Sequence, residues 1–375
     1  MSSNNQWLND ALDKRKGQGL YRHLPDYSGL VDFCSNDYLG IARNPELENA
    51  RKHVLNNYSD ECTHGSTGSR LISGNSTIAV DTESLVARYH KAEAALLFST
   101  GYAANVGLLS AVAGRGDTII TDELIHASLI DGARLSHAQR LRFEHNNVDD
   151  LKSKLQKAKG RCFVVIESVY SMDGDMAPMK DIVHICTEFD AFLIVDEAHA
   201  IGVFGKNGEG MVSEAGLENE VWARVVTYGK AMGIHGAAIL GSTSLIHYLI
   251  NFSRSFIYST ALPKEAYGSI QASYKLVEKA HTERKQLEEN ISYFKKQATS
   301  AGLNVLNSDS AIQGVLVRGN KEGKEKENDL RRNGMACKAI LSPTVPEGRE
   351  RLRVSLHAFN TLEEIDLLIK TLKEA

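Results

Sequence analysis

Short apolar runs alternate with amphipathic stretches between about residues 80 and 230 of this 375-residue chain. The apolar runs contain few charges and are typical of parallel strands covered on both faces. The stretches between them repeat apolar residues at helical spacing. This alternation predicts an α/β domain with a mostly parallel sheet. The expected strands are residues 95–98, 118–121, 141–143, 163–166, 192–196 and 225–230, and the expected helices are 82–89, 104–112, one from about residue 126, 149–158 and 179–189.

The ends of the chain have a different pattern. A long polar-apolar segment, residues 264–301, is expected to be helical and to lead into a second domain. The other expected elements are helices at 6–16, 325–333 and 362–372 and strands at 30–33, 314–317 and 351–357. We therefore expect an N-terminal segment (1–45), a large domain (46–275) and a small C-terminal domain (276–375).

Composition excludes several classes of protein. The formal net charge is -4 and there is no long basic run, so nucleic acid and anionic membrane surfaces are not expected partners. The five cysteines are scattered without a C-x-x-C pair, which predicts no metal site and fits a reducing cytoplasm. No apolar run has the length of a membrane span, and the first residues lack the apolar core of a signal peptide. A soluble cytoplasmic protein is the expectation.

An acid, a histidine and a lysine follow two of the expected strands. Asp196 ends an apolar strand, His199 comes three residues later, and Lys230 follows the next strand among glycines. Open α/β sheets bind ligands at the carboxyl ends of their strands. A lysine amine can form a Schiff base with pyridoxal phosphate, and a carboxylate can keep the pyridine nitrogen of that cofactor protonated. The order of these residues therefore favours a pyridoxal phosphate site.

Two other interpretations compete with this one. The letters Asp-Glu-Ala-His at 196–199 also occur in ATP-driven helicases, which need a phosphate loop ending in Gly-Lys-Ser or Gly-Lys-Thr. The Gly-Lys pairs here end at Lys206, Lys230 and Lys324 and are followed by Asn, Ala and Glu, which excludes the helicase. Taken singly, Asp196 is equally explained as a helix cap and Lys230 as a solvated loop lysine. The combination favours the cofactor.

Three further features are weaker signals. The turn at 99–102 lies between a strand and a helix, a geometry that binds phosphate through backbone N–H groups, although a plain turn has the same pattern. The loop 63–70 is rich in glycine and hydroxyl residues and is suited to a phosphate or a neighbouring subunit, but alone it is an ordinary loop. Arg353 lies on a strand face, where an arginine can bind a carboxylate, yet such arginines are more often structural.

Together these segments resemble the α-oxoamine synthases, pyridoxal phosphate enzymes with the aspartate-aminotransferase fold. The resemblance covers nearly the whole chain and, within the family, is greatest to the biotin-pathway members. It implies a fold-type I α/β architecture, with a seven-stranded mostly parallel sheet flanked by helices and a smaller α+β C-terminal domain. The matching segments are residues 35–40, 68–71, 171–175, 196–199, 227–230 and 343–346, with 236–241 and 256–260 supporting the biotin type.

The resemblance also implies roles for individual residues. Lys230 would hold the cofactor and act as general base, Asp196 would pair with the pyridine nitrogen, and His126 would stack on the ring. Ser171 and His199 would lie near the ring oxygen. Gly101, Tyr102 and Thr227 would contact the phosphate of the cofactor. Thr260 would contact the phosphate in the other subunit of a homodimer whose active site lies at the subunit interface. Arg353 would bind the carboxylate of the amino acid, and Asn36 and Thr344 would lie on the substrate side.

The activity implied is the decarboxylative condensation of an L-amino acid with an acyl-CoA, most simply L-alanine with pimeloyl-CoA. Glycine with acetyl-CoA, serine with a long-chain acyl-CoA, an aminotransferase reaction, and a degenerate homologue acting as partner subunit remain alternatives. The chain departs from the biotin type at Tyr21, where an arginine is frequent, with Arg22 beside it. Thr67 stands where a glycine is common.

Overall fold

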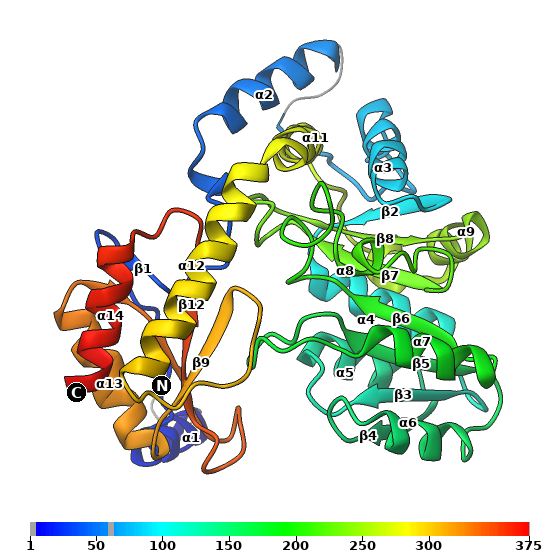
Figure 1. The fold of residues 1–375 in the computed structure, drawn as a ribbon. Helices are drawn as coiled ribbons and strands as arrows, with labels where there is room; N and C mark the ends of the chain where they lie inside the picture. Colours follow the sequence, from blue (N-terminus) through cyan, green and yellow to red (C-terminus); the bar gives the residue numbers. More distant parts are fainter. Residues whose placement is uncertain (1–4, 59–63, 375) are drawn as a thin grey trace.

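A computed structural model describes residues 5–58 and 64–374 of the chain. Figure 1 shows a large part built on a twisted sheet and a smaller part that contains both the last helix and the first strand. Thr63, the first residue of the glycine- and hydroxyl-rich loop, lies outside the described residues. The α-helices are α1 Gln6–Gly17, α2 Glu46–Leu55, α3 Thr77–Tyr89, α4 Gly101–Val112, α5 Ala127–Leu135, α6 Val148–Leu155, α7 Met179–Glu188, α8 Met211–Glu214, α9 Thr243–Phe252, α10 Arg254–Ile257, α11 Lys264–Lys279, α12 His281–Ser300, α13 Gly319–Arg332 and α14 Leu362–Glu374, with 3-10 turns at Ile41–Arg43 and Asn56–Tyr58.

Seven strands form the sheet of the large part, in the order β2-β8-β7-β6-β5-β3-β4. Every neighbouring pair is parallel except the two pairs that involve β8. The predicted α/β class and mostly parallel sheet are therefore confirmed, but β8 was not predicted as a strand. Its residues were noted only as a small, apolar motif after the lysine. The strands are β2 Ala94–Phe98, β3 Thr118–Asp122, β4 Gln139–Phe143, β5 Cys162–Glu167, β6 Phe192–Asp196, β7 Ala223–Thr227 and β8 Ala237–Gly241.

The smaller part has a three-stranded antiparallel sheet, β11-β12-β9, beside helices α12, α13 and α14. A two-stranded parallel sheet joins β1 near the N-terminus to β10, so the start of the chain is part of this unit. All five residues of β12 are buried, including Arg351 and Arg353. Apolar and charged residues alternate along this strand, but both of its faces are covered and neither is exposed to solvent. The strands are β1 Val31–Asp32, β9 Ile312–Leu316, β10 Met335–Ala336, β11 Lys338–Ile340 and β12 Arg351–Ser355.

The segment expected as one helix over 264–301 is two helices. The prediction was wrong at Ala280, where ψ is 42° and the chain leaves the helical conformation between α11 and α12. Ala280 is buried in the same hydrophobic cluster as Val277 of α11 and Leu287 of α12. The break lets α11 pack on α2 and α3 while α12 packs on α14. Local sequence carries no proline or glycine at this position, so tertiary packing determines the bend.

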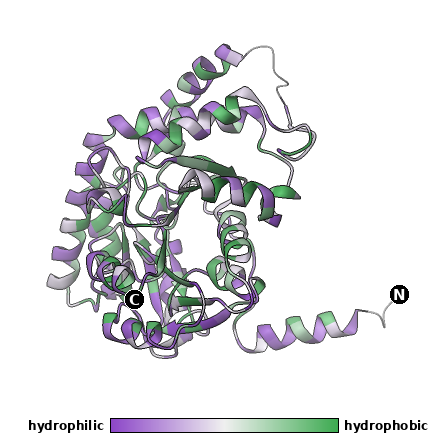
Figure 2. Ribbon diagram, turned by 90° about the vertical axis from the view of Figure 1, so that its right-hand side faces the viewer, coloured by the Kyte–Doolittle hydropathy of each residue, from purple (hydrophilic) through white to green (hydrophobic). Residues whose placement is uncertain are grey.

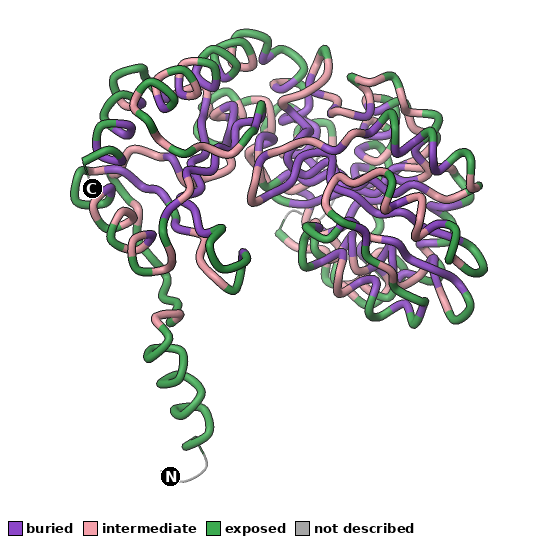
Figure 3. Tube along the Cα trace, turned by 60° about the horizontal axis from the view of Figure 1, so that its bottom comes forward, coloured by how far each residue is buried: buried purple, intermediate pink, exposed green. Residues whose placement is uncertain are grey.

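Two hydrophobic clusters hold the chain together. One lies around β3, β5, β6 and the helices α4, α5 and α7. The other runs from the opposite face of the sheet, through α11, into the smaller part. Figure 3 shows the buried segments continuing from one part into the other. Because one apolar cluster contains residues of both parts, the two parts bury apolar surface against each other in one continuous core.

Helix α1 has little contact with the rest of the chain. None of its residues is buried, and Figure 2 shows it projecting away from the body of the molecule. Trp7 is 68% exposed, and Leu24 in the segment that follows is 99% exposed. Within residues 5–58 and 64–374, no helix combines the length and apolar character needed to cross a bilayer.

A buried ion pair fixes the strand ends next to the predicted site. Glu197, which is fully buried, accepts hydrogen bonds from Arg224 of β7 at 2.6 and 2.8 Å and from the backbone N–H of Val212 at 2.9 Å. Arg224 also donates to the carbonyl of His90 at 3.1 Å. A buried charge is tolerated only when its partners are complete.

We therefore predict that Arg224→Met destabilises the protein by about 3–5 kcal/mol, since it leaves the Glu197 carboxylate buried and unpaired. Urea unfolding followed by circular dichroism measures the change. The matched control is Lys152→Met, which breaks an exposed pair with Glu188 and should cost less than about 1 kcal/mol. Equal losses in the two variants would contradict the prediction.

A second polar cluster holds the loop after β5. His145 bonds through Nδ1 to Asp122 at 2.9 Å and through Nε2 to Asp175 at 2.6 Å. Burial alone would lower the pKa of His145, but the hydrogen bonds to both aspartates raise it to about 10. The imidazolium thus ties the loop that carries Asp175 to the end of β3.

A histidine whose folded-state pKa is raised contributes stability in full below its unfolded pKa, near 6.5, and loses that contribution as pH rises toward 10. We predict that the unfolding free energies of wild type and His145→Gln differ most below about pH 6.5 and converge toward pH 10. Urea unfolding across that range measures this difference, with the exposed His247→Gln as control. A constant difference between wild type and His145→Gln would refute the assigned ion cluster.

Candidate active site

Three adjacent parallel strands deliver polar residues to one edge of the large sheet. Glu167 ends β5, Asp196 ends β6 and Thr227 ends β7, and Glu167 and Asp196 are direct cross-strand partners. A cavity of about 290 Å³ opens at this edge. Its lining residues are Asn36, Thr100, Gly101, Tyr102, Asn105, His126, Ser128, Glu167, Asp196, Ala198, His199, Thr227, Gly229, Lys230, His235 and Gly236.

Lys230 lies in the tight turn between β7 and β8. Its carbonyl accepts the N–H of Gly233 at 2.8 Å, and Gly233 has a φ of 68°. A Cβ on Gly233 would lie 2.3 Å from the backbone N of Ala42, so the turn packs directly on the N-terminal segment. Burial lowers the pKa of the Lys230 amine, while the charges of Asp196 and Glu167 oppose that shift. An amine with a lowered pKa is a better nucleophile and base at neutral pH.

Asp196 is held by two hydrogen bonds. Its Oδ1 accepts from the backbone N–H of Ala198 at 2.9 Å, and its Oδ2 accepts from Asn105 Nδ2 at 2.8 Å. Asn105 also donates to Ser128 Oγ at 2.9 Å and is itself buried. These bonds fix the carboxylate in the cavity wall. Asn105 was missed by sequence reasoning, although the one amide in the mostly apolar helix α4, one turn after Gly101, was a usable signal.

His126 is the N-cap of α5. Its ring Nδ1 contacts the Ser128 hydroxyl at 2.8 Å, and its backbone N–H donates to Glu167. Burial lowers the pKa of His126, so the imidazole is neutral at neutral pH. Burial, followed by the charge of Asp196, raises the pKa of Glu167. Glu167, a second carboxyl group in the cavity wall, was not predicted as a site residue.

The start of α4 forms the other end of the cavity. Thr100 caps the helix by accepting the N–H of Ala103 at 3.0 Å, and Gly101 is the first helical residue. Thr227 Oγ1 is buried without a hydrogen-bond partner among the described residues. A Cβ on Gly101 would lie 2.5 Å from Thr227 Cγ2, so only glycine fits against this side chain. A helix N-terminus with a free hydroxyl beside it suits a phosphate.

Another part of the cavity wall is a group of hydrogen-bonded polar side chains. The His199 Nδ1 lies 2.7 Å from the Tyr38 hydroxyl, which lies 3.1 Å from Asn36 Oδ1. Arg353 Nη2 donates to the same Asn36 oxygen at 3.0 Å, and Arg353 Nε donates to the Ser171 carbonyl at 2.7 Å. Burial, together with the charges of Lys230 and Arg353, lowers the pKa of His199 well below its ordinary value. Arg353 reaches the edge of the site from β12. The position of Tyr38 in this hydrogen-bonded group was not predicted from the sequence.

The structure therefore brings most of the predicted residues together and leaves a few apart. Asn36, Gly101, Tyr102, His126, Asp196, His199, Thr227 and Lys230 line the cavity. Ser171 and Arg353 lie at its edge, where Ser171 contributes a backbone carbonyl. Thr344 lines a second cavity of about 730 Å³, together with Tyr21, Arg22 and Met172. Thr260 pairs with Ser69 in an isolated bridge and does not line the cavity of its own chain.

Thr67 adopts a φ of 52°, the left-handed region that favours glycine. The threonine that stands here, where a glycine is common, therefore has a backbone conformation that glycine adopts more easily. Its loop lines a cavity of about 300 Å³ near Lys264 and Tyr267, apart from the cavity of Lys230.

Comparison with known proteins agrees with this geometry. The model of the family "Aminotransferase class I and II" matches residues 28–372. The chain is 38% identical to an 8-amino-7-oxononanoate synthase of Marinobacter nauticus, over 97% of this chain and 95% of that protein. It is 40% identical to one of Emericella nidulans, over 97% and 94%.

Solved structures show the same fold. A serine palmitoyltransferase variant from S. paucimobilis with a bound PLP–myriocin aldimine superposes with a TM-score of 0.88, at 27% identity over 99% of this chain and 97% of that chain. An 8-amino-7-oxononanoate synthase from Francisella tularensis superposes with a TM-score of 0.80, at 28% identity over 93% and 98%. The chain therefore belongs to the class I and II aminotransferase family of fold type I, and within it to the pyridoxal phosphate-dependent acyltransferases of the α-oxoamine synthase group.

Proposed function

We propose that this enzyme condenses L-alanine with pimeloyl-CoA to give 8-amino-7-oxononanoate, coenzyme A and carbon dioxide, a step of biotin biosynthesis. The observation that carries the proposal is a half-buried lysine of lowered pKa that lines the same cavity as Asp196 at the strand ends. The choice of alanine and pimeloyl-CoA rests on sequence identity of 38–40% to relatives named 8-amino-7-oxononanoate synthase.

The residues of the cavity fit pyridoxal phosphate. The Thr227 hydroxyl, which has no described partner, and the N-terminus of α4 at Gly101 and Tyr102 suit its phosphate. Asp196, fixed by Asn105, suits its pyridine nitrogen. When bound, the cofactor supplies an electron sink for the carbanion formed at the α-carbon of the amino acid.

The chain's own groups then have distinct tasks. Lys230 would hold the cofactor covalently and, once the substrate amine replaces it, would take the α-proton and return it, because its lowered pKa suits a general base near neutral pH. His126 would cover the ring face as a neutral imidazole. Arg353, with Asn36 beside it, would hold the carboxylate of the amino acid through charge-assisted hydrogen bonds. Ser171 and His199 would lie near the ring oxygen.

The second cavity is our candidate site for the acyl chain. It lies beyond Ser171, as Met172 lines it, and it contains Thr344. Arg15 and Arg22 line it with no ion-pair partner among the described residues, whereas Lys338 pairs with Glu327. An arginine without an ion-pair partner suits the far carboxylate of a pimeloyl chain. We propose that it takes the place of the arginine that is frequent in the biotin type where this chain has Tyr21.

Two parts of the proposal concern location and assembly. We place Thr260 at the cofactor phosphate of a second copy of the chain, in a homodimer whose active site lies at the interface. The support is that Thr260 does not line the cavity of its own chain. A cytoplasmic location is also part of the proposal, supported by the free thiols of Cys34, Cys162, Cys186 and Cys337.

A different α-oxoamine synthase is the second candidate. The superposition on serine palmitoyltransferase, with a TM-score of 0.88, favours serine and a long acyl chain. Fold similarity does not separate these enzymes, because they share the scaffold and differ in the substrate pockets. The higher sequence identity to relatives named 8-amino-7-oxononanoate synthase is the reason that we put alanine and pimeloyl-CoA first.

The role of Lys230 is tested by Lys230→Ala. Borohydride reduction of the wild-type holoenzyme should fix the cofactor to the peptide that contains Lys230, detected by mass spectrometry, and the variant should fix none. Coenzyme A release should fall about 10²–10⁴-fold, the usual contribution of a general base. Lys206→Ala, another lysine after a glycine but exposed, is the matched control and should behave as wild type. Retained turnover in Lys230→Ala would overturn the assignment.

The substrates are tested by coenzyme A release with alanine, glycine and serine against acetyl-, pimeloyl- and palmitoyl-CoA. Alanine with pimeloyl-CoA should give the highest kcat/KM. Heptanoyl-CoA, which has the same chain length without the far carboxylate, should be about tenfold poorer or worse, and Arg22→Ala should remove most of that difference. A maximum with serine and palmitoyl-CoA would shift the assignment to the second candidate.

A further inference from the structure

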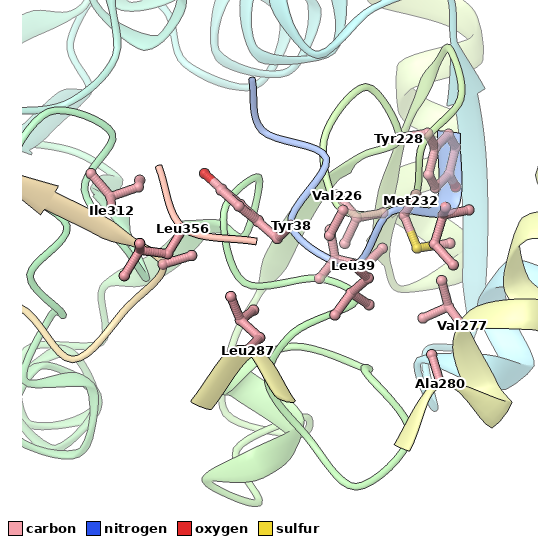
Figure 4. Packing of buried hydrophobic residues seen from close by; sticks show 14 of the residues in the cluster. Tyr38, Leu39, Val226, Tyr228, Met232, Val277, Ala280, Leu287, Ile312 and Leu356 are labelled. Atoms are coloured by element: carbon pink, nitrogen blue, oxygen red, sulfur yellow. The ribbon is translucent and has the colours of Figure 1, made fainter. Parts of the chain in front are cut away.

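Tyr38 is a buried polar residue to which the proposed function gives no task. It belongs to the segment 35–40, between β1 and the first 3-10 turn, and its ring is 1% exposed. Figure 4 shows the ring among apolar side chains that include Leu39 and Val226 on one side and Leu356 on the other. The ring is thus fixed by packing, and the hydroxyl is held at a set position beside the site.

The direction of the hydrogen bonds around Tyr38 follows from the arginine. A guanidinium donates and never accepts, so the Asn36 atom that faces Arg353 at 3.0 Å is the carbonyl oxygen. That oxygen accepts and lies 3.1 Å from the Tyr38 hydroxyl, so the hydroxyl donates its single proton to it. The Tyr38 oxygen is then left as the acceptor for the ring nitrogen of His199 at 2.7 Å.

If the hydrogen bonds ran in the opposite direction, the contact between Tyr38 and Asn36 would contain no hydrogen. If Tyr38 donated to His199, its oxygen and the Asn36 carbonyl oxygen would face each other at 3.1 Å with lone pairs only. Two oxygens that face each other at this distance with no hydrogen between them repel, which makes this arrangement the less stable one. Ionisation does not add or remove a proton here. Burial raises the pKa of Tyr38 to about 12 and lowers the pKa of His199 well below its ordinary value, so both side chains are neutral.

We propose that Tyr38 is a positioning residue that holds His199 in the tautomer protonated at Nδ1, through the ordered chain from Arg353 to Asn36 to Tyr38 to His199. The other ring nitrogen, Nε2, then carries a lone pair and has no protein partner among the residues that the structure describes. Since His199 lines the cavity, it accepts hydrogen bonds from whatever binds there.

This inference deepens the proposed function and rests on it only for the group that His199 meets. If that group is the phenolic oxygen of the cofactor, an accepting Nε2 favours the protonated hydroxyl, whereas a donating Nε2–H favours the ionised form. Removing the Tyr38 hydroxyl deprives Nδ1–H of its acceptor. His199 then changes to the Nε2-protonated tautomer and stabilises the ionised form.

The test measures the proton on His199 directly. Holoenzyme labelled with ring-¹⁵N histidine gives the ¹⁵N shifts of Nδ1 and Nε2, which distinguish a protonated from a bare nitrogen. The signals of His199 among the 13 histidines are assigned by their loss in His199→Gln. Wild type should show a protonated Nδ1 and a bare Nε2, and Tyr38→Phe should reverse the two. The pH at which the bound cofactor's absorption changes should fall in Tyr38→Phe, and coenzyme A release should slow by up to about tenfold, the equivalent of one hydrogen bond.

Tyr27→Phe is the matched control, because the Tyr27 hydroxyl is buried without a hydrogen-bond partner among the described residues. It should leave the His199 shifts unchanged. A bare Nδ1 in wild type, or unchanged shifts in Tyr38→Phe, would overturn the inference, and the wild-type spectrum decides even where the variant folds poorly. Absorption of the same samples reports cofactor binding separately, so failure of the proposed function is distinguishable from failure of the tautomer.

Discussion

Pairing among three parallel strands is the constraint on which the rest of the site depends. The register of β5 and β6 places Glu167 opposite Asp196, and the register of β6 and β7 places Asp196 opposite Val225, two residues before Thr227. Because side chains alternate between the faces of a sheet, a slip of one residue in β6 would move the Asp196 carboxylate to the other face. The hydrophobic cluster that covers these strands therefore also specifies the chemistry at their ends.

Burial of ionisable groups at this edge gives the site its electrostatic character. Burial lowers the pKa of Lys230 and raises that of Glu167, so both groups are drawn toward their neutral forms. Asp196, on the strand between theirs, accepts two hydrogen bonds, from Asn105 and from the backbone N–H of Ala198. A carboxylate fixed by donors, beside an amine of lowered pKa, suits a cationic heteroaromatic ring.

Sequence predicted what local pattern and short motifs determine. The strands that lead to Asp196 and Lys230 are short apolar runs that the pattern predicts. Of the eight predicted residues that line the cavity, several, such as His126 and Asn36, were implied only by the resemblance to the α-oxoamine synthases. The break at Ala280 and the strand β8 were missed because packing, not local propensity, determines them. Asn105, Glu167 and Tyr38 were missed for another reason. Each contacts a partner that is distant in sequence: Asn105 contacts Asp196, Glu167 contacts His126 and Tyr38 contacts His199.

Arg353 shows how the two parts of the chain complete one site. The strand β12 supplies this arginine, but its direction is set by acceptors elsewhere, the Ser171 carbonyl and the Asn36 side chain. The loop that carries Ser171 is held in turn by His145 through Asp175, and by the smaller part through Arg351 with Asp173 and Ser308 with the Gly174 carbonyl. A loop anchored from both sides transmits any relative shift of the two parts to the guanidinium. The position of the Arg353 guanidinium therefore depends on the packing between the parts, whereas Asp196 is held by Asn105 and Ala198 of the large part.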